Sequence, residues 1–194
     1  MRKTLYLKFI LAYFIFGIFG FIAVATVGSS LTTENVRRRV ARNLYQEATE
    51  IAGTYASDLY NSDVTLESVQ RQMETLASYL HAEIWIINPS GRMIVNSSDE
   101  PAPDEEIYVE NFDPTVTNGT YYTQGTFFDS FSGEMLSVFA PITRGYTIRG
   151  YVTIHYPVEA ILEESDSILN IIYIMLLLIF LLSLIILIFF TELV

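Results

Sequence analysis

The sequence has no cysteine among its 194 residues. This absence excludes disulfide bridges and thiolate metal ligands, so any folded part must be stabilised by packing alone. Charged residues are also scarce, because they make up 17% of the chain, where globular domains average about 25%. Only 11 of the charged residues are lysine or arginine, against 22 aspartates and glutamates. This acidic balance excludes nucleic acid as a partner.

Two long stretches, residues 9–33 and 167–191, carry no charge at all. Their apolar cores, residues 9–31 and 168–190, would each extend about 34 Å as helices, enough to cross about 30 Å of hydrocarbon. We therefore expect two transmembrane helices. For the first stretch the alternative is a cleaved signal peptide with Ala23-Val24-Ala25 as its cleavage site. The apolar run continues past a typical signal peptide and leads without a breaker into a helical pattern, which favours a membrane anchor.

Basic residues close to a membrane span predict its orientation. Residues 1–8 hold three basic side chains and are expected in the cytoplasm. The arginines at positions 37–39 and 42 favour the opposite orientation, with the loop in the cytoplasm. Long loops, however, are exported largely regardless of their charge. Residues 32–166 should therefore form one extracytoplasmic domain of a cell-membrane protein, and residues 191–194 should begin a cytoplasmic linker.

The spacing of apolar residues predicts an α+β domain between the two spans. Apolar residues recur every three or four positions from Val36 to Leu59, which predicts a long helix continuous with the first span, and again across residues 65–79. Beyond residue 83 the pattern changes to that of five antiparallel strands, and a short helix after Pro157 should run into the second span. The five expected strands are 84–87, 93–95, one that ends at Phe127-Phe128, 135–142 and 148–156. Asn118-Gly119 predicts a hairpin turn between Thr115-Val116 and Tyr121-Tyr122.

This order of elements resembles the single Cache (extracellular PAS-like) sensor domain of bacterial receptors. Local motifs resemble sensor histidine kinases of Gram-positive, clostridia-like bacteria, and the likeness covers nearly the whole chain. Three stretches carry it: Leu7-Lys8-Phe9-Ile10-Leu11-Ala12-Tyr13, Ala82-Glu83-Ile84-Trp85-Ile86-Ile87-Asn88-Pro89-Ser90-Gly91, and Ala140-Pro141-Ile142 with Gly150-Tyr151-Val152-Thr153-Ile154-His155.

The resemblance implies a HAMP linker and a kinase beyond the point where this sequence stops, with a cytoplasmic response regulator as the partner of that kinase. The chain itself has no glycine-rich ATP lid, and His81-Ala82-Glu83 lacks the basic-Thr-Pro pattern of a phosphoacceptor histidine. We therefore expect no catalytic residue and no cofactor within it. The front end of a chemoreceptor or of a diguanylate cyclase is an alternative, as is a protein- or peptide-interaction module without a small ligand.

Six residues are candidates for ligand binding. Arginine guanidinium groups suit carboxylate or phosphate ligands, and aromatic rings can line a cavity, although aromatic residues in a sheet are usually core and surface arginines commonly balance acidic charge. The candidates are Trp85, Tyr121, Tyr122, Arg144, Tyr146 and Arg149. The ligand itself, whether a small molecule, a cation or a peptide, is left open.

Two further sites follow from charge and spacing. Asp104, Glu105 and Glu106 belong to an acidic segment that could bind divalent cations, with a solvated loop as the alternative. An apolar stripe on the long helix predicts a homodimer interface, since a receptor that signals by moving helices needs two subunits in register. The stripe consists of Val40, Leu44, Ala48 and Ile51.

Overall fold

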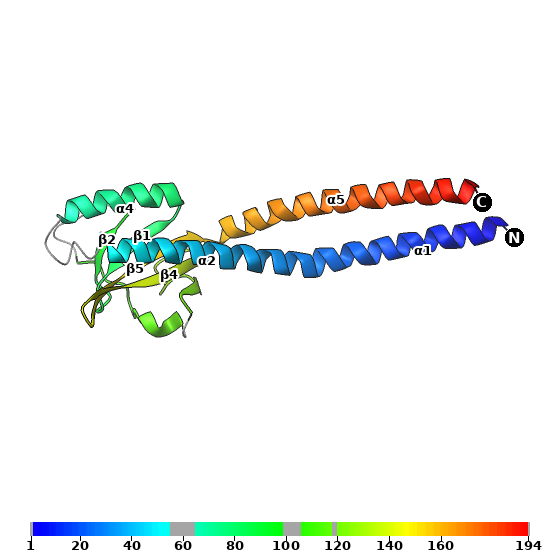
Figure 1. The fold of residues 1–194 in the computed structure, drawn as a ribbon. Coiled ribbons are helices and arrows are strands. Elements are labelled where there is room, and N and C mark those ends of the chain that lie inside the picture. Colours follow the sequence, from blue (N-terminus) through cyan, green and yellow to red (C-terminus); the bar gives the residue numbers. More distant parts are fainter. Residues whose placement is uncertain (1, 55–64, 99–105, 118–119, 194) are drawn as a thin grey trace. The chain divides into compact units, whose positions relative to one another are not determined.

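The structure, a computed structural model, describes residues 2–54, 65–98, 106–117 and 120–193 (Figure 1). The chain divides into two compact units. The helical unit comprises Met1–Val36 and Ile161–Val194, and the sheet unit comprises Arg37–Ala160. Asp104, Glu105 and the expected turn Asn118-Gly119 lie outside the described residues.

The helical unit contains the two apolar helices that the charge-free stretches predict. Helix α1 (Arg2–Ala23) continues through a π-helical turn (Val24–Gly28) into α2 (Ser29–Gly53), and α5 (Val158–Leu193) forms the C-terminal helix. Both are long and apolar enough to cross a membrane. Large apolar side chains point outward on both, as at Phe16 (77% exposed) and Leu182 (60% exposed). Outward apolar side chains are stable in lipid rather than in water.

The sheet unit is built on five antiparallel strands in the order β2-β1-β5-β4-β3, which confirms the α+β prediction. The strands are β1 (Glu83–Ile87), β2 (Met93–Asn96), β3 (Tyr122–Gly125), β4 (Met135–Arg144) and β5 (Thr147–Pro157). Helix α4 (Leu66–Leu80) begins at the cap Thr65, whose hydroxyl accepts a hydrogen bond from the Ser68 amide at 3.3 Å. It packs against β1 and β2.

Side chains alternate between the two faces of this sheet because successive residues of a strand point in opposite directions. One face is aliphatic, and its members are fully buried: Ile84, Ile86, Leu136, Val138, Val152 and Ile154. Each contributes about 1.5–3 kcal/mol by leaving water. The opposite face, here called the aromatic face, carries Trp85, Ser137, Phe139, Thr153 and His155. It is the face that mixes polar and aromatic groups.

The predicted hairpin around Asn118-Gly119 is wrong in its first strand. Pro114–Thr117 forms a turn of 3₁₀-helix instead. The Asp113 carboxylate accepts hydrogen bonds from the Thr115 amide at 2.8 Å and the Thr115 hydroxyl at 2.7 Å, and both bonds lower the pKa of Asp113. This local cap favours a helical turn over the strand propensity of Thr115-Val116.

The third strand is also shorter than predicted. It ends at Gly125, opposite Met135, and does not reach Phe127-Phe128. Those two residues lie in a turn whose backbone has positive φ angles, which no β-strand can accommodate. The turn carries them over the aromatic face.

Candidate functional site

Three polar side chains lie buried together on the aromatic face. His155 of β5 forms two hydrogen bonds through its ring nitrogens. Its Nδ1 lies 2.8 Å from the Ser137 Oγ, and its Nε2 lies 2.9 Å from the Thr153 Oγ1. All three residues are 0% exposed. The register of the sheet makes this possible, because Ser137 pairs directly with His155 across β4 and β5. We call these three residues the buried polar cluster.

Aromatic rings enclose this cluster. The ring centroid of Phe127 lies 4.2 Å from that of His155, and those of Trp85 and Phe131 lie at 4.5 Å and 5.0 Å. Trp85 and Phe131 are themselves stacked at 4.9 Å. The imidazole is therefore held in an apolar box rather than in water.

The box keeps the imidazole neutral. Burial lowers the pKa of His155 from 6.5 to about 3, because removing the ring from water disfavours its charged form. A neutral imidazole has one N–H donor and one acceptor nitrogen. One of the two hydroxyls therefore donates to the ring, and the other accepts from it.

This arrangement leaves hydrogen-bond donors without acceptors. The hydroxyl that accepts from His155 retains its own hydrogen, and the buried Trp85 Nε1 has no hydrogen-bond partner among the described residues. A buried unsatisfied donor costs about 1–3 kcal/mol. The cluster is thus suited to a group that brings acceptor oxygens.

The segment covering the cluster, residues 126–131, has an unusual backbone and is here called the aromatic lid. Phe127, Phe128 and Asp129 have φ angles of 46°, 54° and 57°. Each non-glycine residue in this left-handed region costs about 1–2 kcal/mol. Burial of Phe127 (4% exposed) and a bond of 3.0 Å from the Thr126 hydroxyl to the Asp129 carboxylate offset that strain. Such strain is typical of functional segments.

A surface hollow of about 400 Å³ has His155 in its wall. It lies where β1 and β4 begin and β5 ends, with Met135 and Pro157 beside it. Its acidic side chains are Glu74 and Glu83. The hollow therefore offers carboxylates next to the donor-rich cluster, and it adjoins the residue that directly precedes α5.

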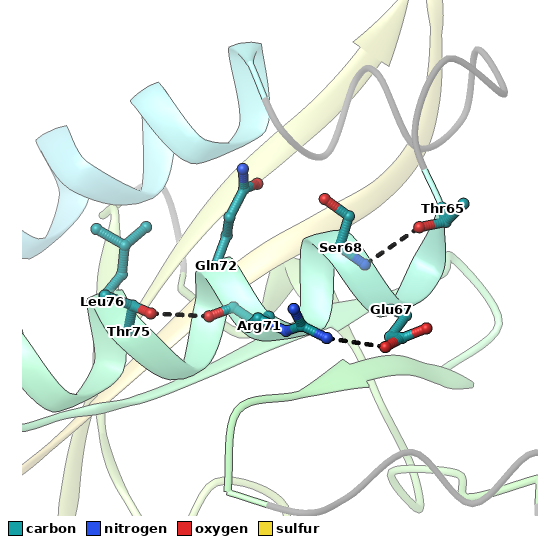
Figure 2. A pocket seen from close by; sticks show the side chains of 7 residues that line it. All are labelled: Thr65, Glu67, Ser68, Arg71, Gln72, Thr75 and Leu76. Atoms are coloured by element: carbon teal, nitrogen blue, oxygen red, sulfur yellow. Dashed lines mark hydrogen bonds and ion pairs between the residues drawn. The ribbon is translucent and has the colours of Figure 1, made fainter.

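A second hollow, of about 620 Å³, lies on the surface of α4 (Figure 2). Within it Arg71 and Glu67 form an ion pair of 2.9 Å whose side chains are 75% and 76% exposed. An ion pair this exposed contributes about 0.3–0.5 kcal/mol. All of its lining residues lie within residues 65–76, so this is an open helix surface rather than an enclosing site.

The six predicted ligand residues fall in three settings. Trp85 belongs to the box around the buried polar cluster. The Tyr121 ring contacts Tyr45 of α2 at 4.9 Å and Tyr122 at 5.5 Å. Arg144, Tyr146 and Arg149 are exposed around the turn between β4 and β5. Of the six, Trp85 alone contacts the buried polar cluster with its ring in the part of the chain that the structure describes.

Glu106 is the one predicted metal ligand that the structure describes. Its carboxylate forms an ion pair of 3.1 Å with Arg92 and accepts a hydrogen bond of 3.1 Å from the Tyr108 hydroxyl. That hydrogen bond raises the pKa of Tyr108. Within residues 2–54, 65–98, 106–117 and 120–193, no group of three potential ligands is placed to hold a metal ion. The cation site remains a prediction.

Most of the predicted dimer stripe is buried inside the single chain. Leu44, Ala48 and Ile51 are 5%, 0% and 2% exposed, whereas Val40 is half-buried. Val40 is thus the most accessible member of the stripe. The homodimer interface stays a prediction.

Ser137, Thr153, Phe128 and Phe131 are not among the site residues predicted from the sequence. A usable signal existed for the first two, because polar residues alternate with aliphatic ones along β4 and β5. A polar residue at an otherwise buried strand position needs a partner, and His155 lies two residues after Thr153.

No family model matches the chain, and no curated protein matches it in sequence. Among solved structures, the sensor domain of the V. cholerae histidine kinase DctB is similar, with a TM-score of 0.52 and 11% identity over 79% of this chain. The chain corresponds to 60% of that sensor domain. At this identity the likeness shows the fold alone, and it agrees with the fold expected for a Cache-type sensor.

Two weaker matches are ligand-binding domains of the Campylobacter jejuni chemoreceptor Tlp3. The domain with isoleucine bound has a TM-score of 0.43 and 12% identity, and covers 72% of this chain and 63% of that one. The complex with 4-methylisoleucine has a TM-score of 0.42 and 13% identity, and the match covers 71% of this chain and 63% of that domain.

Proposed function

We propose that this chain is the extracytoplasmic sensing and transmembrane signalling region of a bacterial membrane receptor. The observation that carries the proposal is the connection of the sheet to the apolar helices. The C-terminal strand β5 ends at Pro157, and α5 begins at Val158. His155 therefore lies two residues from the end of a strand that continues directly into the second apolar helix. A change at the buried polar cluster acts on that helix without an intervening linker.

The proposed topology follows from the charge pattern. Residues 1–8 lie in the cytoplasm, residues 9–31 and 168–190 cross the cell membrane, residues 32–166 form the extracytoplasmic domain, and residues 191–194 begin a cytoplasmic linker. The three sequence stretches that resemble sensor histidine kinases support such a kinase as the parent protein. This kinase would form a homodimer and act on a cytoplasmic response regulator. A chemoreceptor or diguanylate cyclase parent is the alternative.

The candidate site suits a small ligand that bears acceptor oxygens and an amine. Acceptor oxygens would satisfy the donors of Trp85 and the buried polar cluster, and an ammonium group would pair with the carboxylate of Glu83. Because the aromatic lid covers the cluster, binding requires the lid to move. The left-handed strain of the lid lowers the free-energy cost of that movement.

A thermal-shift experiment on the whole chain in detergent tests this proposal. Free L-amino acids, small mono- and dicarboxylates and small amines would each be added. A ligand at 100 times its Kd adds about 2.7 kcal/mol of stability, so at least one amino acid should raise the Tm by several degrees. Glu83→Gln should remove most of the rise, and Glu67→Gln on the exposed surface of α4 should leave it. If none of these compounds raises the Tm, the small-ligand proposal fails.

A second candidate function is recognition of a protein or peptide partner. The turn between β4 and β5 favours it, because Tyr146 is fully exposed (109%) between two exposed arginines, Arg144 and Arg149. Tyrosine and arginine dominate the energetics of protein interfaces. This candidate would stand if no small molecule stabilises the protein.

A further inference from the structure

The first apolar helix contains one turn of π-helix, Val24–Gly28, between α1 and α2. A π-turn holds one residue more than a regular helix accommodates, and such turns are frequent at functional sites. The Thr26 hydroxyl donates to the carbonyls of Ile22 at 2.9 Å and Ala23 at 3.3 Å. It thereby supplies a donor where the regular hydrogen-bond ladder is interrupted.

On the N-terminal side of the π-turn, the first helix contacts α5 through polar and aromatic groups. The Tyr13 hydroxyl donates to the Phe180 carbonyl at 2.8 Å and is hydrogen-bonded to the Ser183 hydroxyl. The rings of Tyr13 and Phe180 stack at 5.0 Å. Gly17 leaves room for Phe180, because a Cβ at that position would overlap the ring.

Two more contacts bracket the π-turn. Before it, the Phe21 ring lies 5.4 Å from that of Tyr173. After it, the hydroxyls of Thr33 and Ser165 share a hydrogen bond of 2.8 Å. The same two helices are therefore in contact on both sides of the turn.

On α5 these contacts share one face. An α-helix advances 100° per residue, so Ser165 and Ser183 have the same angular position, and Tyr173 and Phe180 lie within about 80° of them. Since α5 is regular throughout, it presents this one face along its whole contact with the first helix.

On the first helix the contacts share a face only because of the π-turn. Tyr13, Gly17 and Phe21 span about 80°. In an unbroken α-helix Thr33 would lie about 120° further than Phe21, and about 200° from Tyr13, on the opposite side. The extra residue of the π-turn reduces the first angle to about 20° and the second to about 100°. Thr33 then faces α5 together with Phe21.

We propose that the π-turn at Val24–Gly28 sets the rotational phase of the first helix, so that its contacts with α5 before and after the turn are made together. If the turn became α-helical with all residues retained, the two parts of the helix would rotate by about 100° relative to each other. The Tyr13 and Thr33 contacts could then no longer be made together.

Disulfide trapping in membranes tests the phase, and the absence of cysteine from the chain makes it direct. One pair, G17C with F180C, lies before the turn, and the other, T33C with S165C, lies after it. Disulfides form when Cα atoms are about 4.4–6.8 Å apart. Both pairs should crosslink in the otherwise unchanged chain. Deleting Thr26 turns the π-turn into α-helix and preserves the phase, so both pairs should still crosslink at a similar yield.

The matched variant inserts one alanine between Ala25 and Thr26. The inserted residue adds about 100° of rotation between the two parts of the helix, which moves at least one cysteine pair outside disulfide reach. The crosslinking yield of that pair should fall below about a fifth of its original value. The proposal is wrong if the Thr26 deletion abolishes crosslinking of either pair, or if the alanine insertion leaves both pairs crosslinked. If the Thr26 deletion does not accumulate, deletion of Ala25, which also lies in the turn, makes the same prediction. These yields do not depend on any ligand, so a failed ligand test leaves them interpretable.

Discussion

The folded protein is expected to lose about 1.4 kcal/mol of stability for each pH unit below about 6, because of one buried histidine. The pKa of His155 is lowered to about 3 in the fold and returns to about 6.5 on unfolding. Its neutral form is favoured in the fold, so the contribution is fully present above pH 6.5 and is lost progressively as the pH falls toward 3. Between pH 6 and pH 4 the loss amounts to about 2.5 kcal/mol.

The measurement uses Trp85, the one tryptophan of the chain, as a fluorescent probe of the aromatic box. Urea unfolding would be followed from pH 7 to pH 4 in the unchanged chain, in His155→Gln and in His81→Gln. Carboxylates also contribute to acid unfolding, so the difference between variants is the result. His155→Gln should have the shallower slope, and His81→Gln, at an exposed helix end, should keep the original one. Equal slopes in all three chains would contradict a buried neutral imidazole.

Replacing Phe127 by alanine should destabilise the protein by about 3–5 kcal/mol. The ring is 4% exposed and contacts Trp85, Phe139 and His155 at 5.6, 5.5 and 4.2 Å. Its loss leaves a cavity over the buried polar cluster and should shift the Trp85 emission to longer wavelength.

Glycine at the same position separates packing from backbone strain. At ordinary positions glycine is less stable than alanine by about 0.5–1 kcal/mol. Phe127 has a φ of 46°, where alanine costs about 1–2 kcal/mol and glycine costs little. Phe127→Gly should therefore be the more stable of the two variants. The usual order, with alanine more stable, would show that the lid backbone is not left-handed.

The regular elements were predictable because their signals are local. The three- and four-residue spacing of Val69, Met73 and Leu76 predicted α4, which runs from Leu66 to Leu80. The apolar run Ile84–Ile87 and the turn Asn88-Pro89-Ser90-Gly91 predicted β1 and its hairpin partner β2. Each of these signals lies within about ten residues of chain, and tertiary packing reinforces it.

The aromatic lid was not predictable from local sequence. Left-handed backbone favours glycine and, less often, asparagine or aspartate, so Asp129 fits this conformation whereas Phe127 and Phe128 do not. Phe127-Phe128 instead carries strand propensity. The left-handed turn is stabilised by contacts of Phe127 and Phe131 with Trp85 and His155, which are distant in sequence.

The apolar stripe on α2 shows a different limit. Its spacing was interpreted as a homodimer interface, and Leu44, Ala48 and Ile51 are buried within the single chain. Spacing does not tell whether a face is covered by the same chain or by a second copy. Here the chain itself covers it. The π-turn likewise had no signal in residues 24–28, because its effect on helix phase depends on contacts with α5, more than a hundred residues later.

Cysteine labelling in spheroplasts tests most directly the proposal that residues 32–166 lie outside the cell between two membrane spans. Single cysteines would be placed at Thr4, Tyr146 and Thr191 of the cysteine-free chain and treated with a membrane-impermeant maleimide. Tyr146→Cys should be labelled in intact spheroplasts, because its side chain is fully exposed on the domain proposed to be extracytoplasmic. Thr4→Cys and Thr191→Cys should be labelled only after the membrane is permeabilised. Labelling of Thr4→Cys or Thr191→Cys in intact spheroplasts, or protection of Tyr146→Cys until permeabilisation, would contradict the account.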